Sequence, residues 1–120
     1  MPLSGLNVLI AEDEAMVLMG LEDAVQKAGA RQVLSVRTCS QALKIAQSDA
    51  IDIALLDINL ADCEVYEAAS VLQEKQIPFA FYSGRARRDM VSVQFPKAGW
   101  ISKPSSDEEI ISELSRLVVD

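Results

Sequence analysis

Five short apolar runs, each about as long as one β-strand, alternate along the chain with segments of helical periodicity. This alternation predicts βα units, in which helices cover both faces of a parallel sheet. The third run is almost uninterrupted, as a central strand buried on both faces requires. We expect the strands at residues 6–11, 32–36, 51–56, 79–82 and 99–101.

The helical segments carry start and stop signals. In the first, apolar residues recur at helical spacing from Leu18 to Ala28, and Gly29 follows as a C-cap. Thr38 is expected to cap the second helix while Gln41 reaches back, as in a capping box. The second helix should end near residue 48, and the others are expected at about 64–75, at about 87–93 and from residue 105 onward.

The size and composition of the chain predict one domain. It has 120 residues, of which 50% are apolar and 24% are charged, an ordinary globular composition. The five βα units fill the whole length without a linker or an internal repeat. We therefore expect a single domain over residues 1–120.

Charge and missing residue types exclude several functions. The formal net charge of −7 opposes direct binding to nucleic acid, because phosphate backbones are bound by Lys and Arg. The apolar runs are far shorter than the roughly 20 residues needed to cross a bilayer, so we expect a cytoplasmic protein with no membrane contact. The chain has no histidine, so any phosphohistidine must belong to a partner.

The two cysteines, Cys39 and Cys63, lie far apart in the sequence and without metal-ligand spacing. With no secretory signal, a disulfide framework is not expected. We expect both thiols to be reduced and mainly structural.

Polar residues follow four of the five predicted strands. In open α/β sheets the reactive site lies beyond the carboxyl ends of the strands, where the strand order reverses. Glu12 and Asp13 follow the first strand, Asp57 the third, Ser83 the fourth and Lys103 the fifth. We expect these side chains to converge at one edge of the sheet.

Such a constellation suits phosphoryl transfer. Crowded carboxylates repel one another, and a divalent cation such as Mg²⁺, which prefers oxygen ligands, would offset their charge. Asp57 can act as a nucleophile toward phosphorus. Lys103 can pair with Asp57 and then with a phosphoryl oxygen, to which the Ser83 hydroxyl can also donate.

These residues, in this order and at these intervals, resemble the receiver domains of two-component response regulators. The resemblance covers essentially the whole chain, including the pairs Ser83-Gly84 and Lys103-Pro104. The segment 78–84 resembles a subgroup with an aromatic-rich fourth strand that is common among stand-alone regulators. The resemblance implies a flavodoxin-like doubly wound (βα)5 fold with strand order 2-1-3-4-5.

The resemblance also implies a role for each residue. Asp57 would be the phosphoacceptor, and Ser83 and Lys103 would contact its phosphate. Mg²⁺, or Mn²⁺ in its place, would be bound by Asp13, Asp57 and the backbone carbonyl of Asn59, with Glu12 acting through water.

Two further features follow from the resemblance. Ser83 and Trp100 would form the switch, with the bulkier Trp100 indole where the family usually has Tyr or Phe, and the Lys103-Pro104 peptide would be cis. The loop after Asp57 departs from the family pattern, with Ala61 in place of the usual Pro and Val65 in place of the usual Gly.

The implied partners are a sensor histidine kinase or a histidine phosphotransfer protein, a downstream protein target and, in a homodimer, a second copy. The domain would not be an enzyme, apart from catalysing its own phosphorylation and dephosphorylation.

Three alternatives fit the sequence less well. A receiver-like interaction module without phosphorylation would be expected to lack Asp57, Lys103 or the acidic pair. A phosphohydrolase with an aspartate nucleophile needs a second acid two positions later, where Asn59 stands. A flavin carrier needs a phosphate-binding loop after the first strand, where the acidic residues 12–14 would repel phosphate.

Overall fold

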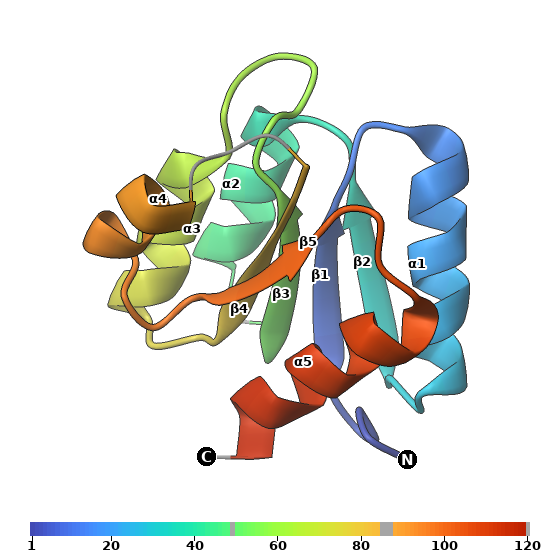
Figure 1. Ribbon diagram of the computed structural model, residues 1–120. Helices are drawn as coiled ribbons and strands as arrows, with labels where there is room; N and C mark the ends of the chain where they lie inside the picture. The colour runs from blue at the N-terminus through green and yellow to red at the C-terminus, as the bar shows by residue number, and fades with distance from the viewer. Residues whose placement is uncertain (49, 85–87, 120) are drawn as a thin grey trace.

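The computed structural model describes residues 1–48, 50–84 and 88–119, apart from the side chain of residue 119, and forms a parallel five-stranded sheet flanked by helices (Figure 1). The strand order is β2-β1-β3-β4-β5, which confirms the flavodoxin-like prediction. In chain order the elements are β1 (Asn7–Ala11), α1 (Ala15–Lys27), β2 (Gln32–Val36), α2 (Cys39–Gln47), β3 (Ile53–Asp57), α3 (Tyr66–Glu74), β4 (Phe79–Ser83), α4 (Arg88–Gln94), β5 (Gly99–Ser102) and α5 (Asp107–Val119).

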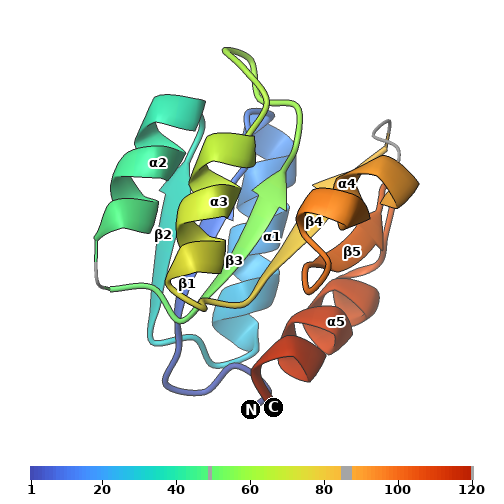
Figure 2. The same ribbon diagram turned by 90° about the vertical axis from the view of Figure 1, so that its left-hand side faces the viewer.

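Helices cover both faces of the sheet, so the domain has three layers. Helices α2, α3 and α4 lie on one face, and α1 and α5 lie on the other (Figure 2). A hydrophobic core lies between the sheet and each layer of helices. Strand side chains alternate between the two cores: Leu9 and Leu56 face the helices α2, α3 and α4, whereas Ile10 and Leu55 face α1 and α5. Among the described residues, no helix has the length and apolar character required to span a membrane.

Aromatic side chains fill the core between the sheet and helices α3 and α4. Phe81 on β4 is fully buried and contacts Phe79, Phe95, Tyr66 and Trp100, with ring centroids 5.4–6.1 Å apart. Each pair is arranged edge to face, a favoured geometry for aromatic rings. The aromatic fourth strand therefore anchors this face of the sheet.

The predicted caps are present. Gly29 has φ +97°, and the Ala30 amide donates to the Val25 carbonyl, so the turn after α1 uses a conformation that favours glycine. The Thr38 hydroxyl accepts a hydrogen bond from the Gln41 amide at 3.2 Å, and the Gln41 side chain reaches back to the amide of Arg37.

Some element boundaries differ from the prediction by two residues. β3 begins at Ile53 because Asp52 instead exchanges hydrogen bonds with Asn7. α3 begins at Tyr66 because Glu64 forms an isolated bridge with Asn59. The predicted helix start at residue 87 lies outside the described residues.

The expectation that the two cysteines are reduced is wrong for this structure. Cys39, at the start of α2, and Cys63, in the loop between β3 and α3, form a disulfide with a Cα–Cα distance of 6.1 Å. Sequence spacing did not indicate this bond because the residues come from separate βα units, which only the folded sheet brings to the same edge. The two sulfurs also lie near the Asp62 carboxylate, but since they are bonded to each other they offer no thiolate to a metal.

Substitution of Gly99, the first residue of β5, can test how closely α5 packs on the sheet. A Cβ atom at this position would lie 2.8 Å from Leu117 Cδ1, 2.7 Å from Glu113 Oε2 and 3.2 Å from the Cβ of Ala80. We expect Gly99→Ala to lower the free energy of unfolding by about 1–3 kcal/mol, as measured by urea denaturation, because Ala80 belongs to the neighbouring strand and cannot move aside. Gly20→Ala is the matched control.

In that control, a Cβ at Gly20, on the exposed face of α1, would have no neighbour within 4 Å. The substitution should therefore stabilise the protein by roughly 0.5–1 kcal/mol through helix propensity. Equal unfolding curves for Gly99→Ala and wild type would contradict the close packing of α5.

Candidate phosphoryl-acceptor site

The polar residues that follow the strands meet at one edge of the sheet, as the sequence predicts. Glu12 and Asp13 follow β1, and Asp57 is the last residue of β3, the central strand. One carboxylate oxygen from each of these three residues lies within 4.8 Å of the others. The parallel pairing of β1 with β3, in which Ala11 is opposite Leu56, brings these groups together.

Lys103, directly after β5, places its ammonium group between two of the carboxylates. Its Nζ lies 3.0 Å from Oδ2 of Asp57 and 3.1 Å from Oε1 of Glu12. The backbone supports this position, because the Lys103 amide donates to the Ser83 carbonyl at 3.1 Å. The Lys103-Pro104 peptide is cis, as the resemblance implies.

The second carboxylate oxygen of Glu12 and that of Asp57 each accept a hydrogen bond from a backbone amide. The Glu14 amide donates to Oε2 of Glu12 at 3.0 Å, and the Asn59 amide donates to Oδ1 of Asp57 at 3.2 Å. Burying a carboxylate is costly unless its oxygens are paired in this way. The site is therefore a hydrogen-bonded network around the Asp57 carboxylate.

Burial shapes the electrostatics of the pair formed by Glu12 and Lys103. Glu12 is 0% exposed, and burial raises the pKa of its carboxyl above 4.5, against the opposing effect of the Glu14 amide and Lys103. Burial alone would lower the pKa of Lys103, but its hydrogen bonds to Asp57 and Glu12 outweigh this effect and raise it. Lys103 therefore stays charged at neutral pH.

The other predicted site residues lie at or near this edge. Ser83 is buried at the end of β4, in the strand next to Asp57. Asn59 lies two residues beyond Asp57 and is exposed at the start of the following loop. The Trp100 ring packs edge to face against Phe81, on the face covered by α2, α3 and α4, three residues before Lys103.

Two contacts at the site were not predicted from the sequence. The Lys103 ammonium lies 5.0 Å from the centre of the Tyr82 ring, a cation–π contact. The Arg37 guanidinium donates to the backbone carbonyl of Asp13 at 2.7 Å. Arg37 directly follows β2, so applying the strand-end rule to that strand as well would have indicated it.

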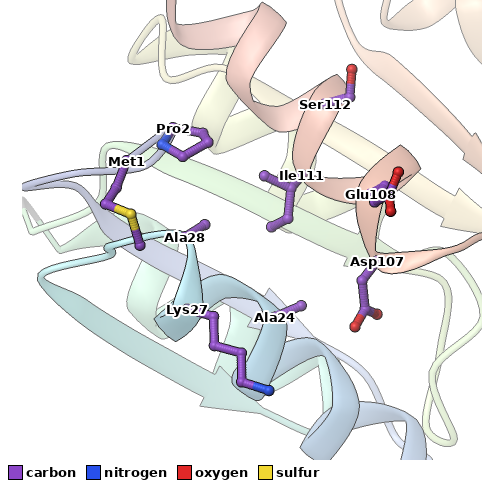
Figure 3. A pocket seen from close by; sticks show the side chains of 9 residues that line it. All are labelled: Met1, Pro2, Ala24, Lys27, Ala28, Asp107, Glu108, Ile111 and Ser112. Carbon is purple, nitrogen blue, oxygen red and sulfur yellow. The ribbon is translucent and has the colours of Figure 1, made fainter.

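A hollow of about 470 Å³ lies outside this cluster (Figure 3). It is lined by the N-terminal segment, the end of α1 and the beginning of α5, with the side chains of Ala24, Ala28 and Ile111 among its walls. None of its lining residues belongs to the carboxylate cluster, so this hollow is not the candidate site.

Comparison with known proteins agrees with the fold. The model of the response regulator receiver domain family matches residues 8–115, and the chain belongs to this family. Phosphorylation-dependent signalling in two-component systems is the standard role of the family. Its members are generally signalling domains and not enzymes, they interact with histidine kinases or phosphotransfer proteins, and they bind Mg²⁺ at an acidic pocket.

Individual relatives show how far the similarity extends. A response regulator receiver protein from Sinorhizobium medicae WSM419 superposes with a TM-score of 0.87 at 27% identity, covering 96% of this chain and 95% of that one. The receiver domain of the sensor histidine kinase PA1611 from Pseudomonas aeruginosa PAO1 shares the fold, with a TM-score of 0.82 at 20% identity and coverage of 98% and 100%. The transcriptional regulatory protein PdtaR of Mycobacterium tuberculosis is 28% identical over 116 residues. These residues cover 93% of this chain and 56% of PdtaR, so the chain spans little more than half of that relative.

Proposed function

We propose that the chain accepts a phosphoryl group on Asp57 from a phosphohistidine of a partner protein. The observation that supports this most directly is the position of the Asp57 carboxylate, which is almost buried at the end of the central strand and 3.0 Å from the Lys103 ammonium. A carboxylate oxygen of Asp57 attacks the phosphorus atom, a P–O bond forms, and the P–N bond to the imidazole breaks. The histidine side chain is the leaving group.

The oxygen donors at the site suit a hard divalent cation. Asp13, Asp57 and the Asn59 backbone carbonyl would hold Mg²⁺ or Mn²⁺, with Glu12 contributing through water. When bound, the cation offsets negative charge on the phosphoryl oxygens. The receiver domain of PA1611, which shares the fold, was solved with a magnesium ion coordinated in its active-site cleft.

Lys103 and Ser83 hold the phosphoryl group after transfer. The Lys103 ammonium, which pairs with Asp57 in the unmodified protein, can bind a phosphoryl oxygen once that carboxylate is esterified. The Ser83 hydroxyl donates to another phosphoryl oxygen. These new bonds draw the segments after β4 and β5 toward Asp57 and, with movement of Trp100, change the surface offered to partners.

The proposed partners are a sensor histidine kinase or a histidine phosphotransfer protein upstream, and an output protein or a second copy of the chain downstream. The catalytic activity is confined to phosphorylation and dephosphorylation of Asp57 itself, and we place this activity in the cytoplasm.

Phosphorylation by a small donor tests the proposal. With acetyl phosphate and MgCl₂, intact-mass analysis should show one added phosphoryl group on the wild type and none on Asp57→Asn, because the amide cannot act as the nucleophile. Chelation of Mg²⁺ should also abolish labelling. Asp52→Asn is the matched control, since Asp52 precedes the same strand at its opposite end and should leave labelling unchanged. Unchanged labelling of Asp57→Asn would assign the phosphoryl group to another residue.

A further inference from the structure

The loop between β3 and α3 is a small hairpin-like turn whose tip is exposed. The Val65 amide donates to the Ile58 carbonyl at 3.0 Å, and the Leu60 amide donates to the Cys63 carbonyl at 3.1 Å. Ile58, Leu60 and Val65 are buried in the core, whereas residues 61–64 are exposed. Packing therefore anchors residues 58, 60 and 65, whereas the exposed Asn59 and the tip at residues 61–64 depend on other contacts.

Two contacts join this tip to the first residue of α2. Cys63 is disulfide-bonded to Cys39 across 24 positions of sequence, and Oδ1 of Asp62 accepts a hydrogen bond from the Cys39 amide at 2.9 Å. Of these two contacts, only the disulfide is covalent. Reduction would leave the tip joined to Cys39 by an exposed hydrogen bond, which is a weak constraint.

The loop is also part of the candidate site. It begins immediately after Asp57, and the Asn59 amide donates to Oδ1 of Asp57 at 3.2 Å. Asn59 pairs with Glu64 in an isolated antiparallel bridge, and Glu64 directly follows the disulfide-bonded Cys63. A constraint on the tip therefore acts, through this bridge, on the backbone next to Asp57.

We infer that Cys39 and Cys63 form a reversible redox tether that sets the affinity of the Asp57 site for a divalent cation. This inference rests on the proposed function, because it assigns the cation to Asp13, Asp57 and the Asn59 carbonyl. In the oxidised form the loop is already ordered with the three carboxylates gathered, so binding a cation orders little further backbone. In the reduced form, binding of the cation to the Asn59 carbonyl must also order the tip, because Glu64 in the tip pairs with Asn59.

The disulfide is accessible to small thiols. Cys63 is exposed, and a hollow of about 250 Å³ beside the bond is lined by both cysteines. Exposed disulfides are typically the labile and regulatory ones, whereas buried disulfides resist reduction. Exchange with a small disulfide should therefore begin at Cys63.

Oxidised glutathione supplies the balanced reaction. The Cys63 thiolate attacks one sulfur of oxidised glutathione, forms a mixed disulfide and releases one glutathione. The Cys39 thiolate then attacks the Cys63 sulfur, the protein disulfide forms, and the second glutathione leaves. Two electrons pass from the protein sulfurs to glutathione, and the two protons of the cysteine thiols end on the two glutathione thiols. Excess reduced glutathione reverses both steps.

Mg²⁺ titration of the two redox forms tests the inference. The wild type is equilibrated with oxidised or reduced glutathione, thiol alkylation followed by intact-mass analysis counts its free cysteines, and calorimetry measures Mg²⁺ binding. We expect the reduced form to bind Mg²⁺ roughly 3- to 10-fold more weakly, because it lacks a preordered loop. Its Tm should fall by roughly 5–15 °C, since a cross-link of this length constrains the unfolded chain.

The double variant Cys39→Ser/Cys63→Ser provides the control. It should match the reduced wild type in both Tm and Mg²⁺ affinity, and it should not respond to glutathione. Equal Mg²⁺ affinities for the oxidised and reduced wild type, or the absence of the disulfide after oxidation, would overturn the inference while leaving the proposed function intact. Failure of both forms to bind Mg²⁺ or accept a phosphoryl group would overturn the two together.

Discussion

We expect replacement of Lys103 by Met to lower the free energy of unfolding by about 2–3 kcal/mol at pH 7 in metal-free buffer. The substitution leaves the carboxylates of Glu12 and Asp57 without their ammonium partner. Breaking a fully buried ion pair costs about 3–5 kcal/mol, and the 24% exposure of the Lys103 side chain lowers the expected cost. Urea denaturation measures the loss.

The pH dependence of this loss identifies its cause. Burial already raises the pKa of Glu12 above 4.5 in the folded protein, and loss of the ammonium raises it further. A carboxyl group whose pKa is higher in the folded than in the unfolded protein does not destabilise the fold below its unfolded-state pKa, because it is protonated in both states. It destabilises the fold as the pH rises through its folded-state pKa, because the folded protein must then hold a buried charge. The deficit of Lys103→Met should therefore be largest at neutral pH and shrink as the pH falls toward 4.5.

Mg²⁺ and a control variant complete the test of Lys103. A cation at the site offsets the same carboxylate charges, so adding Mg²⁺ should stabilise Lys103→Met by more than it stabilises the wild type. Lys97→Met, which removes the same charge from an exposed position between α4 and β5, should show neither the deficit nor the enhanced response. Similar unfolding curves for the two variants at pH 7 would contradict a structural role for the Lys103 network.

We expect replacement of Asp13 by Asn to weaken Mg²⁺ binding by at least about 10-fold, because even loss of a group that only supports a metal ligand costs roughly 10- to 100-fold. Asp13 contributes one of the three clustered carboxylates, and the amide that replaces it carries no charge and is a poorer ligand for a hard cation. Phosphorylation by acetyl phosphate should fall in parallel at limiting Mg²⁺ and recover as the Mg²⁺ concentration is raised. Calorimetry measures the affinity, and intact mass measures the labelling.

Glu14→Gln is the matched control for Asp13. Glu14 is exposed and lies one residue further along the same edge, outside the cluster of three carboxylates. Its replacement removes the same charge and should change Mg²⁺ affinity by no more than a few-fold, through the general field of the site. Equal losses in the two variants would indicate a diffuse acidic surface and not a defined metal site.

The network also bears on the proposed phosphorylation of Asp57. Lys103 is shared between Glu12 and Asp57, so esterification of Asp57 would remove one of its two anionic partners and supply phosphoryl oxygens in exchange. The Lys103 amide donates a hydrogen bond to the Ser83 carbonyl. This bond couples the segment after β4 to the segment after β5. A change at Asp57 reaches both segments through a single side chain.

The sequence was sufficient for the five βα units and for the gathering of the candidate site residues at one edge of the sheet, and the family resemblance supplied the strand order. The alternation of apolar runs with helical segments predicts five βα units because side-chain periodicity follows directly from strand and helix geometry. The strand-end rule then gathers Glu12, Asp13, Asp57, Ser83 and Lys103 at one edge, since all parallel strands present their carboxyl ends together. Both conclusions depend on local patterns and on one general property of parallel sheets.

Only the tertiary structure decided how these groups are paired. The complete burial of Glu12, the sharing of Lys103 between two carboxylates and the contact of Arg37 with the Asp13 backbone depend on the packing of neighbouring βα units. The bond between Cys39 and Cys63 was wrongly expected to be absent for the same reason. Local patterns determine which residues reach an edge of the sheet, whereas side-chain contacts at that edge depend on distances between segments that are remote in the sequence and that meet only when the helices pack on the sheet.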